Sequence, residues 1–165
     1  MTPAVTLEEL LIWNQESASR WNSRLDADPA LLQVPCSIGG SSNVQQFVAH
    51  IWGVELRWGQ RLADLPVLAK ESVPPGPLAA LFALHAEASA IYRRLLADPA
   101  QNWDLIMPLD VVWLPQQART PTRRKVLAHA LLHSQRHYAQ LATLLRNAGF
   151  PPQIEGDLLF TNAMR

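Results

Sequence analysis

The stretch Leu127-Ala-His-Ala-Leu-Leu-His-Ser-Gln-Arg-His-Tyr-Ala-Gln140 carries three histidines at four-residue spacing, His129, His133 and His137. Residues i and i+4 lie one above the other on an α-helix, so this spacing predicts a row of imidazoles along one helix. A neutral imidazole is also the commonest metal ligand among side chains. The stretch therefore predicts a helical protein with a candidate metal site on its last long helix.

The rotation of about 100° per residue along a helix indicates which of these imidazoles point inward. The apolar residues of the same helix define one buried arc: Val126, Ala130, Leu141, Leu144 and Ala148. His133 and His137 fall within this arc, whereas His129 lies at its edge, about 80° from His137. We therefore predict that His133 and His137 face the protein interior and that His129 is exposed or at the rim.

Four segments, at 6–26, 43–64, 78–97 and 120–148, have the apolar spacing of amphipathic helices. Thr6 followed by Glu9 predicts a capping box at the start of the first. Thr120 before Pro121 predicts the start of the last. Helices separated by proline-rich links, with one longer connection, favour an all-α four-helix bundle.

The segment 101–119 has a mixed pattern that includes Val111-Val112-Trp113-Leu114-Pro115. We interpret it as a crossover with a strand-like or extended piece. The six tryptophans of the chain are unusual at this length. Exposed aromatic helix faces often mark interfaces, so we expect a homodimer, with four candidate contact residues. These are Trp13, Trp21, Trp103 and Trp113.

The composition argues against two classes of protein. The 14 basic and 14 acidic residues give a net charge of zero, which offers no electrostatic case for nucleic-acid binding. No apolar run approaches the roughly 18 residues that a membrane span requires. The N-terminal residues lack a signal-peptide pattern, and the single Cys36 suits a reducing compartment. We therefore expect one cytoplasmic domain over residues 1–165.

A third imidazole within reach strengthens the case for a metal site. His50 lies at the edge of the apolar stripe of the second predicted helix, and it meets His133 and His137 if the second and fourth helices are neighbours. Three neutral nitrogens with an open position are typical of catalytic metal sites. They permit zinc, nickel, iron or cobalt. The alternative is that these histidines are structural and bind no metal.

Two other residues could complete such a site. His85 shares a stripe with Leu81 and Tyr92 on the third predicted helix. It is either a buried histidine bonded to a neighbouring helix or a group that faces the substrate. Glu55 lies about one turn beyond His50, and we interpret it as a surface or boundary residue rather than a carboxylate beside the metal.

Two stretches resemble a known protein family. They are Val48-Ala-His-Ile-Trp-Gly-Val-Glu-Leu-Arg-Trp58 and His133-Ser-Gln-Arg-His-Tyr-Ala-Gln-Leu-Ala-Thr-Leu-Leu-Arg146. The second is similar to the signature H-x-x-H-H-R-G-Q-x-x-x-x-L-R of the DinB superfamily, and the first to its helix that carries the first histidine. The resemblance implies an up-down four-helix bundle with a long crossover connection. It also implies a metal triad of His50, His133 and His137.

The chain departs from this signature in two places. Arg136 stands where the signature has the first of two paired histidines, and Tyr138-Ala139 stand where it has Arg-Gly. DinB proteins of known activity transfer low-molecular-weight thiols or use one in an isomerisation. The resemblance thus implies a metal-dependent thiol S-transferase, or a related hydrolase or isomerase, that acts on a small molecule with zinc, nickel or iron. The alternative is a stress-related bundle that binds metal or small molecules without catalysis.

Overall fold

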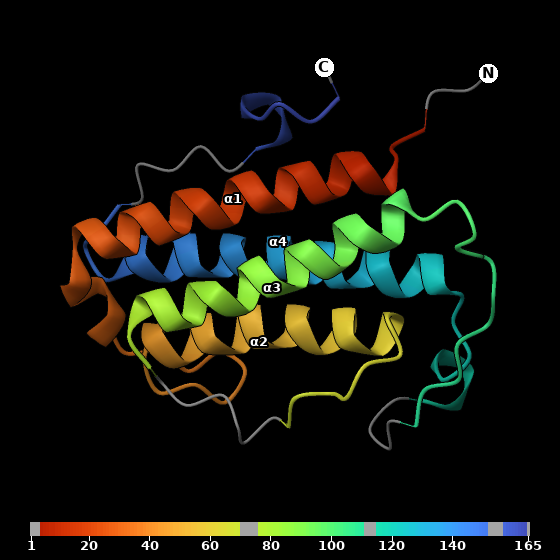
Figure 1. The fold of residues 1–165 in the computed structure, drawn as a ribbon. Helices are drawn as coiled ribbons and strands as arrows, with labels where there is room; N and C mark the ends of the chain where they lie inside the picture. Colours follow the sequence, from red (N-terminus) through yellow and green to blue (C-terminus); the bar gives the residue numbers. More distant parts are fainter. Residues whose placement is uncertain (1–3, 70–75, 111–114, 152–156, 165) are drawn as a thin grey trace.

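A computed structural model describes residues 4–69, 76–110, 115–151 and 157–164 (Figure 1). Four α-helices dominate them: α1 (Leu7–Ala27), α2 (Val44–Leu62), α3 (Leu78–Ala97) and α4 (Arg123–Asn147). Short 3-10 helices lie between or beyond them: η1 (Pro29–Gln33), η3 (Gln116–Ala118) and η4 (Leu158–Phe160). These residues contain no named strand and no helix long and apolar enough to cross a bilayer. The predicted all-α four-helix bundle is confirmed.

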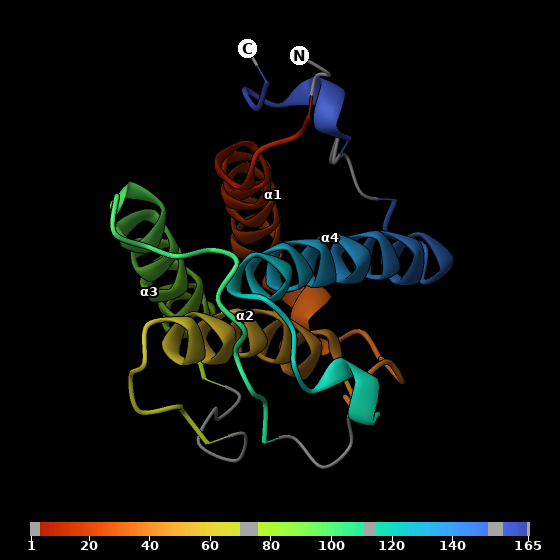
Figure 2. The same ribbon diagram turned by 90° about the vertical axis from the view of Figure 1, so that its right-hand side faces the viewer.

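Each long helix packs against two others, so that α1, α3, α2 and α4 follow one another around the bundle (Figure 2). The helices α2 and α3 run in the same direction, because Trp52 contacts Phe82 and Glu55 contacts His85. The end of α2 and the start of α3 therefore lie at opposite ends of the bundle (Figure 1). The predicted long crossover is present, and it lies between α2 and α3.

The segment 101–119 was expected to supply the crossover, and this expectation is wrong. It joins the end of α3 to the start of α4 at the same end of the bundle (Figure 1). The extended piece predicted at 111–114 lies outside the described residues.

The start of α4 also differs from the prediction. Thr122, not Thr120, is the N-cap, and its hydroxyl accepts a hydrogen bond from the backbone N–H of Lys125 at 3.2 Å. The backbone N–H of Met107 donates to the carbonyl of Pro121 at 2.8 Å. This pairing holds Pro121 outside the helix, so that Pro121 is not the first helical residue.

The starts of α1 and α2 follow their capping signals. The Thr6 hydroxyl accepts from the backbone N–H of Glu9 at 3.1 Å, and the Glu9 carboxylate accepts from the backbone N–H of Thr6 at 2.7 Å. At α2, the Asn43 side chain accepts from the backbone N–H of Gln46 at 2.9 Å. Such caps satisfy backbone groups that the first turn leaves unpaired.

The core contains two hydrophobic clusters with polar side chains between them. Along α2, the residues up to Trp52 belong to one cluster and those from Leu56 onward belong to the other. Buried polar side chains from all four helices lie near this boundary, and we call them the polar layer: Asn14, Ser17, Glu55, His85, Ser89 and Ser134. A buried polar group is costly unless it is hydrogen-bonded, so the layer constrains how the helices can pair.

Within the described residues, the tryptophans do not form the exposed face expected of a dimer contact. Trp21 is only 3% exposed and stacks on Tyr138, with 6.4 Å between ring centroids. The prediction that Trp21 lies at an exposed interface is therefore wrong. Trp13 and Trp103 are half-buried, and Trp113 lies outside the described residues.

Candidate metal centre

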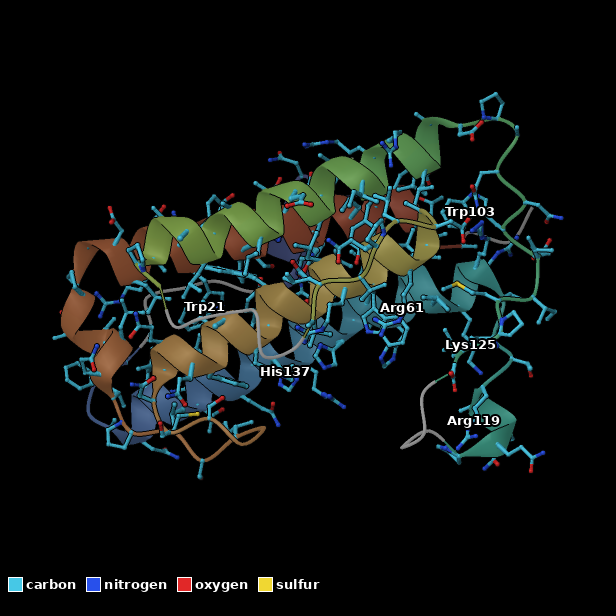
Figure 3. All side chains as sticks on the ribbon, turned by 60° about the horizontal axis from the view of Figure 1, so that its bottom comes forward. Trp21, Arg61, Trp103, Arg119, Lys125 and His137 are labelled. Carbon is cyan, nitrogen blue, oxygen red and sulfur yellow. The ribbon has the colours of Figure 1, made fainter. Side chains whose placement is uncertain are left out.

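Three histidines meet on the face between α2 and α4. His50 comes from α2, and His133 and His137 come from successive turns of α4. One ring nitrogen from each lies within 4.8 Å of the others, so the group can hold a metal ion. Figure 3 shows His137 between these two helices, with Arg61 farther along α2. The structure thus brings together the three residues that the sequence singled out.

The depths of the α4 histidines follow the predicted helical arc. His137 is 5% exposed, His133 is half-buried and His129 is exposed. The His129 ring packs edge-on against Trp58, at 5.7 Å between centroids. His129 therefore has the predicted rim position, beside the cluster rather than within it.

The amide of Gln140 fixes the tautomer of His137. His137 donates from Nδ1 to Oε1 of Gln140 at 2.6 Å, so its Nε2 carries the lone pair. That Nε2 faces the Nε2 of His133 at 3.0 Å. Two nitrogens bound at 2.0–2.1 Å to one tetrahedral ion would lie about 3.3 Å apart. The pair thus fits a shared ion with little movement.

Gln140 was not singled out from the sequence, although a signal was available. It follows His137 by three residues, a spacing that brings two side chains together on a helix surface. By contrast, Nδ1 of His133 is buried and has no hydrogen-bond partner within the described parts of the chain. Of the two α4 ligand candidates, only His137 has its ring oriented by a side chain in this way.

Burial keeps the two α4 imidazoles neutral. Desolvation lowers the pKa of His133 from 6.5 to about 3, and the nearby His137 and His50 contribute to this shift. Desolvation also lowers the pKa of His137, which the hydrogen bond to Gln140 partly opposes. Because the neutral ring is the form that binds metal, both side chains are ready to act as ligands at neutral pH.

A glycine turn and an aromatic ring wall off part of the site. Gly39 adopts a positive φ of 64°, and a Cβ on it would lie 3.8 Å from Cδ2 and Nε2 of His50. The turn before α2 therefore lies against the His50 ring. Phe47 packs edge-on against His137 at 5.2 Å between centroids. These contacts reduce the access of water to the imidazoles.

Glu55 is part of the core, and its prediction as a surface or boundary residue is wrong. It is 1% exposed and accepts hydrogen bonds from Nδ2 of Asn14 at 2.7 Å and from Nδ1 of His85 at 2.6 Å. Five residues beyond His50, it is rotated by about 140° around α2 and faces α1 and α3. Glu55 therefore does not join the three histidines. His85 has the predicted role of a buried histidine bonded to a neighbouring helix.

A model of the DinB family matches residues 1–162 of this 165-residue chain. The chain belongs to the DinB family. No protein with a curated description matches this DinB chain. The family is therefore established, whereas the reaction has to be argued from the site itself.

Proposed function

We propose that this DinB chain is a metal-dependent enzyme in which His50, His133 and His137 bind one divalent ion, either zinc, nickel or iron. The observation that supports this is the convergence of three imidazole nitrogens within 4.8 Å on one face of the bundle. Three protein ligands leave a position for a small ligand. A divalent ion bound there supplies a lowered pKa for a thiol or a water, and hence a nucleophile at neutral pH.

The reaction we propose is transfer of a low-molecular-weight thiol to an electrophilic small molecule. The thiol loses its proton to solvent water, sulfur forms a bond to an electrophilic carbon, and the leaving group departs with the electron pair of the broken bond. Gln140 would hold the proton on Nδ1 of His137 throughout, which keeps Nε2 available as a ligand. Phe47 and the turn at Gly39 would limit the access of water to the nucleophile.

Elemental analysis of purified, tag-free protein tests the metal site. We expect about one divalent ion per chain, as a three-histidine site would bind. His50→Ala, His133→Ala and His137→Ala should each lose it. His129→Ala is the matched control, because His129 lies on the same helix but outside the cluster, and it should retain the ion. A wild-type protein that does not bind zinc, nickel or iron would contradict the proposal and would favour a purely structural role for the histidines.

Thiol consumption with a panel of electrophiles tests the reaction. Metal-loaded wild-type protein should turn over at least one thiol and electrophile pair, and His133→Ala should not. A loaded protein that binds thiols without any turnover would contradict the enzymatic proposal. It would favour the non-catalytic binding role instead.

We also propose that the protein acts in the cytoplasm as a homodimer. The single Cys36 is buried, which suits a chain that needs no disulfide. Leu105 and Ile106 are each 51% exposed and provide apolar surface for self-association. Light scattering after size-exclusion chromatography should give twice the chain mass, and a monomer at micromolar concentration would contradict the proposed dimer.

A further inference from the structure

A pocket of about 500 Å³ opens along α4, and its lining includes Gln140, the hydrogen-bond partner of His137. Its apolar walls include Ile38, from the loop before α2, and Leu144. Its polar lining includes Arg136 and Gln140. We call it the Arg136 pocket. The pocket is shallow and open to solvent.

The Arg136 pocket adjoins the candidate metal centre through two side chains. Gln140 lines the pocket and also accepts the Nδ1 proton of His137. Arg136 directly precedes His137 on α4 and lines the same pocket. A molecule in this pocket would therefore lie directly beside the His137 ligand.

The charge of the pocket indicates the class of ligand. Among the described residues that line it, Arg136 alone is charged, and its side chain is exposed. A guanidinium matches a carboxylate through two parallel hydrogen bonds, which makes Arg the side chain best suited to select that group. Ile38 and Leu144 provide apolar surface for the rest of such a molecule.

Both departures from the DinB signature touch this pocket. Arg136 replaces the first of the paired histidines, Ala139 replaces the glycine, and both residues line the cavity. The metal-ligand positions of the signature are unchanged. The pocket is therefore a feature in which this chain differs from the signature.

We propose that the Arg136 pocket binds the carboxylate of an apolar small acid, with Arg136 as the residue that selects the anion. The substrate of the enzyme is accordingly an acidic electrophile, and this part of the inference rests on the proposed function. Its carboxylate pairs with Arg136, its apolar part lies against Ile38 and Leu144, and its reacting carbon lies toward the histidines. The carboxylate site itself does not depend on catalysis.

Titration of metal-free protein with hexanoate and with 1-hexanol, followed by NMR, tests the site without metal coordination of the carboxylate. Hexanoate should shift the amide signals of Gln140 and Thr143 and should bind more tightly than hexanol. Arg136→Gln should weaken hexanoate by about tenfold, the effect of one charge-assisted contact. Arg93→Gln on α3, an exposed residue with the same loss of charge, should leave binding unchanged.

Ala139→Phe gives a second variant that keeps Arg136 but fills the cavity. Ala139 is exposed, so the larger side chain should not disturb the core, and circular dichroism checks the fold. This variant should lose hexanoate binding. Equal hexanoate affinity in the wild type and Arg136→Gln, or equal affinity of the wild type for hexanoate and hexanol, would overturn the carboxylate site.

A separate kinetic measurement tests the proposed substrate class. Metal-loaded protein with a thiol should show a higher kcat/KM for 4-bromocrotonate than for its methyl ester, and Arg136→Gln should abolish that preference. Turnover with equal kcat/KM for acid and ester overturns the acidic substrate but leaves the proposed function standing. Absence of metal binding, with hexanoate still bound at Arg136, overturns the proposed function but leaves the carboxylate site standing.

Discussion

The hydrogen bond from His137 to Gln140 decides which nitrogen of His137 faces the other imidazoles. Gln140→Leu removes the acceptor, and we expect divalent-ion affinity to fall by roughly 10- to 100-fold, as for other groups that orient a ligand. Gln140→Glu keeps an acceptor at the same place and should retain the affinity. Competition with a chelator measures both. An unchanged affinity in Gln140→Leu would show that packing alone orients the ring.

The buried imidazole of His133 should make the stability of the metal-free protein depend on pH. Its pKa in the folded protein is about 3, below the ordinary 6.5, so below pH 6.5 the unfolded chain binds a proton that the folded protein does not. The stabilisation is complete above pH 6.5 and is lost progressively as the pH falls toward 3. His133→Ala lacks this contribution.

Urea unfolding of wild type and His133→Ala between pH 7 and 4 tests this dependence. The free energy of unfolding of the wild type should fall more steeply with decreasing pH than that of the variant. Because a single proton is involved, the slopes of the two curves can differ by at most about 1.4 kcal/mol per pH unit. Parallel curves for the two proteins would mean that the folded protein accepts the proton at His133 as readily as the unfolded chain.

At the scale of a helix, the cap of α4 provides a comparison between two threonines. Thr122 caps α4 through its hydroxyl, whereas Thr120 is exposed and lies before the helix. Thr122→Ala should lower the free energy of unfolding by about 1 kcal/mol. Thr120→Ala should change it by less than about 0.5 kcal/mol. A larger loss of stability in Thr120→Ala than in Thr122→Ala, measured by thermal or urea unfolding, would contradict the observed start of α4.

The ends of α3 and α4 show when local sequence signals are sufficient to predict where a helix begins and ends. The bounds of α3 agree with the predicted 78–97, where prolines precede the helix and Asp98-Pro99 follows it. The start of α4 was misplaced by two residues, because the decisive interaction joins Pro121 to Met107, fourteen residues earlier in the chain. Local capping patterns do not contain that pairing.

At the scale of the whole molecule, the pair Glu55–His85 links α2 to α3 inside the core. Glu55→Ala should lower the free energy of unfolding by about 3–5 kcal/mol, since it leaves buried donors unpaired. The double variant Glu55→Leu with His85→Leu removes both partners and should recover much of that loss. Urea unfolding of the three proteins measures this. A double variant that is less stable than Glu55→Ala would contradict it.

The candidate site was more predictable than the packing around it. Spacing placed His133 and His137 inward and His50 at the edge of the apolar stripe of α2, and the resemblance to DinB proteins implied the same three residues. These signals lie within single helices. Glu55 was misjudged because its partners Asn14 and His85 are on other helices, and nothing in its own segment reveals them. That residues 1–165 form one domain stays a prediction, which a single cooperative unfolding transition would support.

The polar layer has a consequence for the axial position of α2. A slip of one turn, about 5.4 Å, would carry Glu55 away from His85 and into one of the hydrophobic clusters. The same slip would carry His50 away from the imidazoles of α4 on the opposite side of the helix. A sequence that is selected to fold with α2 in this register is thereby also selected for the convergence of its histidines. A mutation that loosens the packing on the Glu55 side of α2 should therefore also disturb the position of His50, and the reverse should hold as well.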